Sequence, residues 1–178
     1  MRSIIFTTVY LCLSLAGLAS AAPKKPSGPP AAPGLSYLYT LNVTAGVTYP
    51  VGPGPRGTRV VLTINGGNFA GPKLKGNLMP VGGDFALLDA NNPDPNKVFT
   101  PDVKMVLETH DGQYIYKHFT GEMQENGDTL IRVGFETGSE KYYWLNSVVG
   151  VGTVKRLLPF PSDLLTFDIW KVELPKSK

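Results

Sequence analysis

The residue whose setting most favours acid–base chemistry is Asp84. It follows Gly82-Gly83 and precedes Phe85, at the end of a stretch, residues 64–85, that contains six of the chain's twenty glycines. Paired glycines in strands are typical of bulges and sharp corners. A carboxyl group held there beside an aromatic ring is partly desolvated, which raises its pKa toward values that suit proton transfer. The alternative is that Asp84 caps a turn through its own backbone.

A second titratable candidate is His118, which shares one face of a predicted strand with Tyr116. The opposite face carries Ile115, Lys117 and Phe119, because side chains alternate between the two faces of a strand. If the first face lines an interior, His118 and Tyr116 form an aromatic wall suited to proton transfer and ligand binding. If that face points outward, His118 is a surface histidine. The sequence leaves both orientations open.

Three further residues could bind a ligand. Arg59 follows Gly57 at the start of a predicted strand. An inward guanidinium there would bind a carboxylate, enolate or phenolate, whereas an outward one would pair with a surface acid. Trp144 and Asn146 are two residues apart, so on a regular strand they share a face. Such a pair can stack on a flat ligand and hydrogen-bond its carbonyl group, although core packing explains the tryptophan equally well.

The segments that carry these residues have the pattern of β-strands. Apolar and polar side chains alternate over residues 35–44, 58–65 and 103–109, and period two is typical of a half-buried strand. Asp111-Gly112 and Asn126-Gly127 separate such segments and predict hairpins. Further strands are predicted at 73–79, 85–89, 113–120, 121–123, 129–137, 142–154 and 164–174, and a loop at 45–57. With no sustained helical periodicity, we predict an all-β domain of about eight to ten strands, a barrel in preference to a sandwich.

The N-terminal residues have the three parts of a secretory signal peptide. Arg2 precedes an apolar run, and Ala19-Ser20-Ala21 has the small residues of a cleavage site. We predict a signal peptide at 1–21, a Pro/Gly-rich linker at 22–34 and a barrel domain at 35–175, in a secreted protein without a membrane anchor. The only cysteine, Cys12, would leave with the signal, so the mature chain has no disulfide.

Composition and missing motifs narrow the function further. The formal net charge is +3 and no basic cluster exceeds two residues, so nucleic-acid binding has no support. The two histidines make no familiar zinc set, and neither a phosphate loop nor a Gly-x-Ser-x-Gly elbow occurs. We therefore expect neither a metal nor a cofactor. Asn42-Val43-Thr44 is a glycosylation sequon on the polar face of the first strand, which predicts a glycan at Asn42.

Three blocks together resemble one family. They are Gly57-Thr58-Arg59, then GGNFAGPKLKG with GGDF (residues 66–76 and 82–85), and FETGSEKYYWLN (residues 135–146). The combination looks like the domain-of-unknown-function 3237 family, also called uncharacterised protein family 0311, over about residues 35–174. The resemblance implies a single antiparallel β-barrel with a central cavity. Some fungal members direct a stereoselective ring closure in small-molecule biosynthesis.

The chain departs from that family in two respects. It has Phe85 where tryptophan is usual, and it carries a predicted signal peptide and linker. Our first hypothesis is a secreted barrel that binds a small, partly aromatic molecule in its lumen and acts as a cofactor-independent cyclase or isomerase. Asp84 or His118 would shuttle protons, while Arg59 and Asn146 would stabilise an oxyanion. The alternative is a non-enzymatic ligand carrier or a host-directed interaction protein. The oligomeric state stays open.

Overall fold

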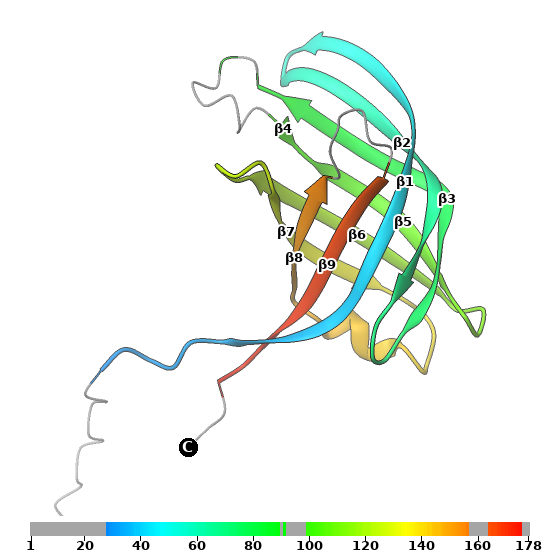
Figure 1. The fold of residues 1–178 in the computed structure, drawn as a ribbon, viewed down its shortest axis with the longest axis vertical. Coiled ribbons are helices and arrows are strands. Elements are labelled where there is room, and N and C mark those ends of the chain that lie inside the picture. Colours follow the sequence, from blue (N-terminus) through cyan, green and yellow to red (C-terminus); the bar gives the residue numbers. More distant parts are fainter. Residues whose placement is uncertain (1–27, 90, 92–98, 157–163, 176–178) are drawn as a thin grey trace, which may run out of the picture. The chain divides into compact units, whose positions relative to one another are not determined.

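The computed structural model describes residues 28–89, 91, 99–156 and 164–175. The predicted signal peptide and residues 22–27 of the predicted linker lie outside these residues. The chain divides into two units, residues 1–31 and residues 32–178. Of the first unit only residues 28–31 are described, and these are exposed. The second unit is built from β-strands (Figure 1).

The strands of the second unit form one closed antiparallel barrel. In chain order they are β1 (Gly34–Gly54), β2 (Gly57–Ala70), β3 (Lys75–Leu88), β4 (Phe99–Thr100), β5 (Asp102–Thr109), β6 (Tyr114–Met123), β7 (Thr129–Glu136), β8 (Gly150–Arg156) and β9 (Leu164–Glu173). The neighbours run β2-β1-β9-β8-β7-β6-β5-β3-β4, and pairing of β2 with β3 closes the ring. Eight strands make the barrel and β4 adds a short ninth on β3. The predicted all-β barrel is confirmed.

Glycines let the long strands bend around the barrel. Gly67 has φ +155° and lies where the β2–β3 register shifts, and Gly82 has φ +97° at a shift between β3 and β5. A Cβ atom on Gly67 would stand 2.0 Å from the carbonyl oxygen of Asn42 on β1. The paired glycines are therefore bulges inside continuous strands. For this reason the strands predicted separately at 73–79 and 85–89 are one strand, β3.

The predicted loop at 45–57 is instead the end of a long hairpin. β1 runs to Gly54 and β2 begins at Gly57, with register shifts between Ala45 and Thr48 and between Pro50 and Gly52. Its apolar side chains Val47, Tyr49 and Val51 are exposed. The prediction failed because proline and glycine are common in loops, whereas bulges accommodate them in this hairpin.

The strand predicted at 142–154 is wrong over its first half. Residues Tyr143–Ser147 form a 3₁₀ helix, η2, and β8 starts only at Gly150. Tyr142 and Leu145 are fully or almost fully buried, and their three-residue spacing matches one turn of a 3₁₀ helix. The hydroxyl of Tyr142 donates to Asp111 at 2.9 Å. The aromatic and β-branched residues of this segment predict a strand. In the structure, the segment instead covers one end of the barrel.

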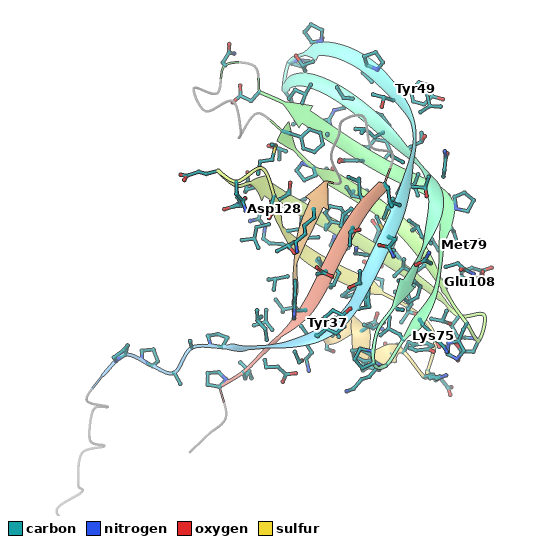
Figure 2. All side chains as sticks on the ribbon, in the orientation of Figure 1. Tyr37, Tyr49, Lys75, Met79, Glu108 and Asp128 are labelled. Carbon is teal, nitrogen blue, oxygen red and sulfur yellow. The ribbon has the colours of Figure 1, made fainter. Side chains whose placement is uncertain are left out.

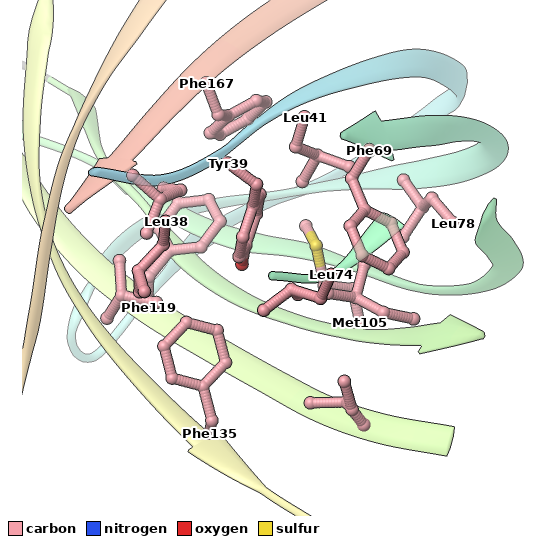
Figure 3. Close-up of a cluster of buried hydrophobic side chains, with 14 of the residues drawn as sticks. Leu38, Tyr39, Leu41, Phe69, Leu74, Leu78, Met105, Phe119, Phe135 and Phe167 are labelled. Carbon is pink, nitrogen blue, oxygen red and sulfur yellow. The ribbon is translucent and has the colours of Figure 1, made fainter. Parts of the chain in front are cut away.

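Apolar side chains pack together inside the barrel (Figure 3), and the cluster includes Leu145 of η2. Tyr39 lies at the centre, with its ring 5.4 Å from that of Phe69 and 6.3 Å from that of Phe135. Leu38 interrupts the alternation of β1 because the β1–β9 register shifts between Tyr37 and Tyr39. That shift lets both Leu38 and Tyr39 point inward.

Candidate functional site

The other part of the barrel interior is a cavity of about 420 Å³. This volume suits a small organic ligand, since ligand pockets are usually about 300–1,000 Å³. The lining reaches the turn between β6 and β7, where Asp128 marks that end of the barrel in Figure 2. The lining side chains are mostly apolar: Val43, Ala45, Leu62, Ile64, Phe99, Pro101, Val103, Met105, Phe119, Met123, Val154, Leu165 and Phe167. Polar groups of the lining gather at the turn, apart from Thr63 and Asp84.

Asp84 lies in the wall of this cavity. It sits on β3 between Leu62 of β2 and Val103 of β5, both of which also line the cavity. Its Oδ1 atom accepts a hydrogen bond from the backbone N–H of Asp102 at 3.0 Å. Burial raises the pKa of Asp84 to about 6; the hydrogen bond from Asp102 and the charge of Lys104 lower it, and the charge of Asp102 raises it further.

The setting of Asp84 differs in one respect from the sequence-based expectation. Phe85 is 40% exposed, because consecutive strand residues point to opposite faces. The cavity wall, and not the neighbouring ring, therefore desolvates the carboxyl group. A carboxyl group with this pKa is present in both protonation states near neutral pH and can give or take a proton. Its catalytic role stays a prediction.

The opposite face of β6 supplies a residue that the sequence analysis did not select. Ile115, Lys117 and Phe119 point into the barrel and are buried, whereas His118 is exposed. The Lys117 ammonium nitrogen Nζ lies 5.0 Å from the ring centre of Phe119 and 5.1 Å from that of Phe167. It has no hydrogen-bond partner among the described residues, and burial lowers the pKa of Lys117 to about 7. The signal in the sequence for an inward Lys117 is its position on the same strand face as Ile115 and Phe119.

The two outward residues of β6 lie away from the cavity. The ring of His118 stacks on that of Tyr116, with ring centres 5.7 Å apart. A Cβ atom on Gly134 of β7 would stand 2.4 Å from the His118 ring nitrogen Nε2, so the imidazole lies across the outside of β7. The face of β6 that carries His118 and Tyr116 thus points outward. Any catalytic or ligand-binding role of these two residues would concern the outer surface of the barrel.

The remaining ligand-binding candidates are not brought together at the cavity. Arg59 donates from Nη1 to the backbone carbonyl of Phe85. Asn146 accepts from the backbone N–H of Thr137 at 2.8 Å and donates to its carbonyl at 2.9 Å, so its amide fastens η2 to the end of β7. Trp144 lies 5.9 Å from the Lys73 ammonium group. Because Trp144 and Asn146 stand on a 3₁₀ helix, two-residue spacing no longer places them on one face.

The glycosylation candidate Asn42 lies on the outside of β1, half-buried. Its amide nitrogen Nδ2 donates to Asn68 at 3.2 Å, and its oxygen accepts from Thr166 at 3.2 Å. A glycan would be attached to that same nitrogen. Glycosylation at Asn42 stays a prediction.

Among residues 28–89, 91, 99–156 and 164–175, no group of three or more His, Cys, Asp or Glu side chains could hold a metal ion. Within the same ranges, no helix has the length and hydrophobicity needed to cross a membrane.

With the barrel and its cavity established, comparison with known proteins gives the family. The family model described as "Protein of unknown function (DUF3237)" matches residues 33–172. The chain belongs to this family. A protein of Penicillium herquei named "Hydroalkoxylation enzyme phnH" is 28% identical over 159 residues, which cover 89% of this chain and 97% of that protein. A UPF0311 protein of Rhodopseudomonas palustris is 26% identical and covers 76% of this chain and 94% of its own length.

Solved structures of similar proteins have the same fold. The crystal structure of a β-barrel-like protein from Acinetobacter baumannii superposes with a TM-score of 0.69 at 26% identity, covering 83% of this chain and all of the other. The crystal structure of an enzyme from Penicillium herquei superposes with a TM-score of 0.66 at 26% identity, with the same coverage. The barrel is therefore shared with a protein described as an enzyme.

Proposed function

We propose that this protein binds a small, partly aromatic molecule in the barrel cavity and catalyses addition of a hydroxyl group across a carbon–carbon double bond, closing a ring without a cofactor. The observation that carries the proposal is Asp84, a carboxyl group with a pKa of about 6 in a largely apolar cavity. Similarity to a protein named as a hydroalkoxylation enzyme supports the reaction class.

The chemistry needs one group that both gives and takes a proton. Protonated Asp84 delivers its proton to one alkene carbon, and the hydroxyl oxygen of the same substrate bonds to the adjacent carbon. The hydroxyl proton then returns to the Asp84 carboxylate, so the reaction is an isomerisation and the enzyme ends as it began. The Asp102 N–H holds one carboxyl oxygen, Oδ1, which leaves Oδ2 for the proton. The apolar wall keeps the proton from bulk water and orients the substrate.

The test uses 2-prenylphenol as a probe, in deuterated buffer. We expect the ring-closed isomer 2,2-dimethylchroman, formed faster than in buffer alone, with one deuterium on the carbon that was protonated. Asp84→Asn should lower the rate at least about a hundredfold, since an amide cannot exchange the proton. The control is Asp168→Asn. Asp168 is a half-buried aspartate on the outer face of β9, and its carboxylate accepts a hydrogen bond from Thr40 of β1. Equal turnover by Asp84→Asn and wild type would refute the role of Asp84.

A ligand carrier is the second candidate. Its support is that Arg59 and His118, expected as partners of Asp84, do not line the cavity. A carrier would bind the probe with micromolar or better affinity and release it unchanged. In that case Asp84→Asn would alter affinity only, and no deuterium would enter the probe.

We also propose that the protein acts outside the cell. The support is the sequence of residues 1–21, which has a basic start, an apolar run and an Ala-x-Ala site. The reaction would then act on an extracellular small molecule.

A further inference from the structure

Two polar groups are buried in the barrel without a partner. Among the described residues, the side-chain atoms that are buried and lack any hydrogen bond are Lys117 Nζ and the hydroxyl oxygen of Tyr39. The two residues are in contact, since Lys117 Nζ lies 5.9 Å from the centre of the Tyr39 ring. Figure 3 shows that ring among Phe119, Phe135 and Leu74, with its hydroxyl oxygen inside the cluster.

Their surroundings offer neither group a partner. Lys117 pairs in register with Met105 of β5 and with Phe135 of β7, and both side chains are buried and apolar. The titratable group that faces Lys117 is Tyr39 itself, whose pKa burial raises well above its ordinary value. Buried polar groups are nearly always hydrogen-bonded, because an unsatisfied one costs about 1–3 kcal/mol. Two adjacent exceptions indicate that a partner is supplied from outside the chain.

The pair lies where the cavity meets the packed core. Phe119 and Phe167 line the cavity, and their rings are also the nearest aromatic neighbours of Lys117 Nζ. The two phenylalanine rings lie 5.5 Å apart. Neither Lys117 nor Tyr39 lines the cavity itself, so a ligand oxygen reaches the amine only where these two rings move apart.

We propose that Lys117 and Tyr39, behind the Phe119 and Phe167 rings at the inner end of the cavity, form a subsite for the acidic hydroxyl group of an aromatic ligand, a phenol or an enol, which enters when these rings move apart. The inference rests on the proposed function, because it requires a ligand in the cavity. The hydroxyl proton moves to the neutral Lys117 amine, and the resulting oxyanion accepts hydrogen bonds from the Lys117 ammonium group and the Tyr39 hydroxyl.

The geometry favours this ligand over a carboxylic acid or a phosphate. A fully charged anion would lose its hydration in an apolar enclosure with one cation to pair with, and burial of such a pair is costly. A phenol enters neutral and ionises only after it reaches the amine. Three aromatic side chains near Lys117 also suit a flat ring: Phe119, Phe135 and Phe167.

The experiment compares two probes of nearly equal shape, 2-naphthol and 2-methoxynaphthalene, by fluorescence titration at pH 7.5. Wild type should bind 2-naphthol at least about tenfold more tightly, because only the naphthol can give its proton to Lys117. Lys117→Met should abolish this preference and leave the affinity for 2-methoxynaphthalene within about twofold. Tyr39→Phe should reduce the preference, and Lys171→Met, which removes a surface lysine paired with Glu173, should leave it unchanged.

A second measurement uses the wild-type protein, so it does not depend on whether a variant folds. In protein labelled with ¹³C at the lysine ε carbon, saturating 2-naphthol should raise the pH midpoint of the Lys117 signal, whereas 2-methoxynaphthalene should not. Equal affinity of wild type for the two probes, an equal loss of both in Lys117→Met, or an unmoved midpoint would each overturn the subsite. If 2-methoxynaphthalene binds but the naphthol preference is absent, only the subsite fails. If neither probe binds, the proposed cavity function fails as well.

Discussion

Asp84 and Lys117 are ordinarily charged at neutral pH, and burial moves the pKa of each toward neutrality from opposite sides. The pKa of Asp84 rises to about 6 and that of Lys117 falls to about 7. Both shifts make the charged form less favourable in the folded protein. The barrel interior therefore retains two groups that cost stability at neutral pH, as expected where residues are kept for function.

The pKa of Asp84 predicts how stability depends on pH. Because its pKa is higher in the folded than in the unfolded chain, the folded state binds more protons between about pH 4 and pH 6. The contribution of Asp84 to stability is thus fully present below pH 4 and is lost as the pH rises through about 6. Asp84→Asn keeps an oxygen for the Asp102 N–H and should gain about 1–3 kcal/mol over wild type at pH 7.5, but nothing at pH 3.5.

Thermal melts of wild type and Asp84→Asn across that pH range measure the difference. Asp168→Asn is the control, since its carboxylate lies on the outer face and accepts from Thr40. A turn cap would give the opposite result: Asp84→Asn would then be less stable than wild type at pH 7.5, by about 1 kcal/mol. That outcome would favour the alternative role of Asp84 as the cap of a turn.

At this scale the sequence could indicate Asp84 but not Lys117. Glycines around a carboxylate are a local signal and can be read directly. Lysine is almost never fully buried, so a lysine on the apolar face of a strand is expected to be a rim residue. The inward face of β6 was decided by its pairing with β5 and β7, which is long-range information. The same pairing turned His118 and Tyr116 outward.

At the scale of the elements, the bulge glycines decide whether the long strands can close the ring. Gly67 has positive φ, and a Cβ atom there would overlap the Asn42 carbonyl of the neighbouring strand. We expect Gly67→Ala to cost about 3 kcal/mol or more, since the clash is with backbone and cannot be relieved by a side-chain rotation. Denaturant unfolding measures the loss.

A matched control for this substitution is Gly138→Ala. Gly138 has no atom within 4 Å of an added Cβ and its φ is not positive. Its change in unfolding free energy should stay within about 0.5 kcal/mol. If Gly67→Ala were as mild as Gly138→Ala, the bulge would not be a requirement of barrel closure.

Element boundaries were less predictable than element types. Strands with regular alternation, such as β5, were assigned correctly because a half-buried strand follows a period of two. β3 was divided because its glycines resemble loop residues, although in the barrel they continue the strand. η2 was missed because Tyr142 and Leu145 bury their side chains against the end of the barrel, and no local pattern distinguishes that from a strand.

At the scale of the whole molecule, closure through β2 and β3 explains how a domain of this size can form without a disulfide. Every barrel strand pairs on both sides, and the core at the η2 end is continuous. The cavity removes packing from the remaining interior, so stability depends on the filled part of the barrel.

Export is the prediction that concerns the full chain. We expect the mature protein to begin at Ala22, after removal of residues 1–21. N-terminal sequencing of protein from the culture medium of an expressing cell checks this, with Ala21→Trp as a control that should block cleavage at the small-residue site. The prediction would be contradicted if the exported protein kept Met1, or if no protein were found in the medium.

The first and last strands of the barrel lie side by side, with Gly34 opposite Glu173 at one end and Val43 opposite Leu165 at the other. Val43 and Leu165 line the cavity, so the chain enters and leaves the barrel at the end remote from it (Figure 1). A short peptide could join the two ends, and new termini could then be opened in an exposed turn such as Asp111-Gly112. An immobilising tag placed just before Gly34 or just after Glu173 would be attached on the side opposite the cavity lining, which makes the protein well suited to surface-based ligand screening.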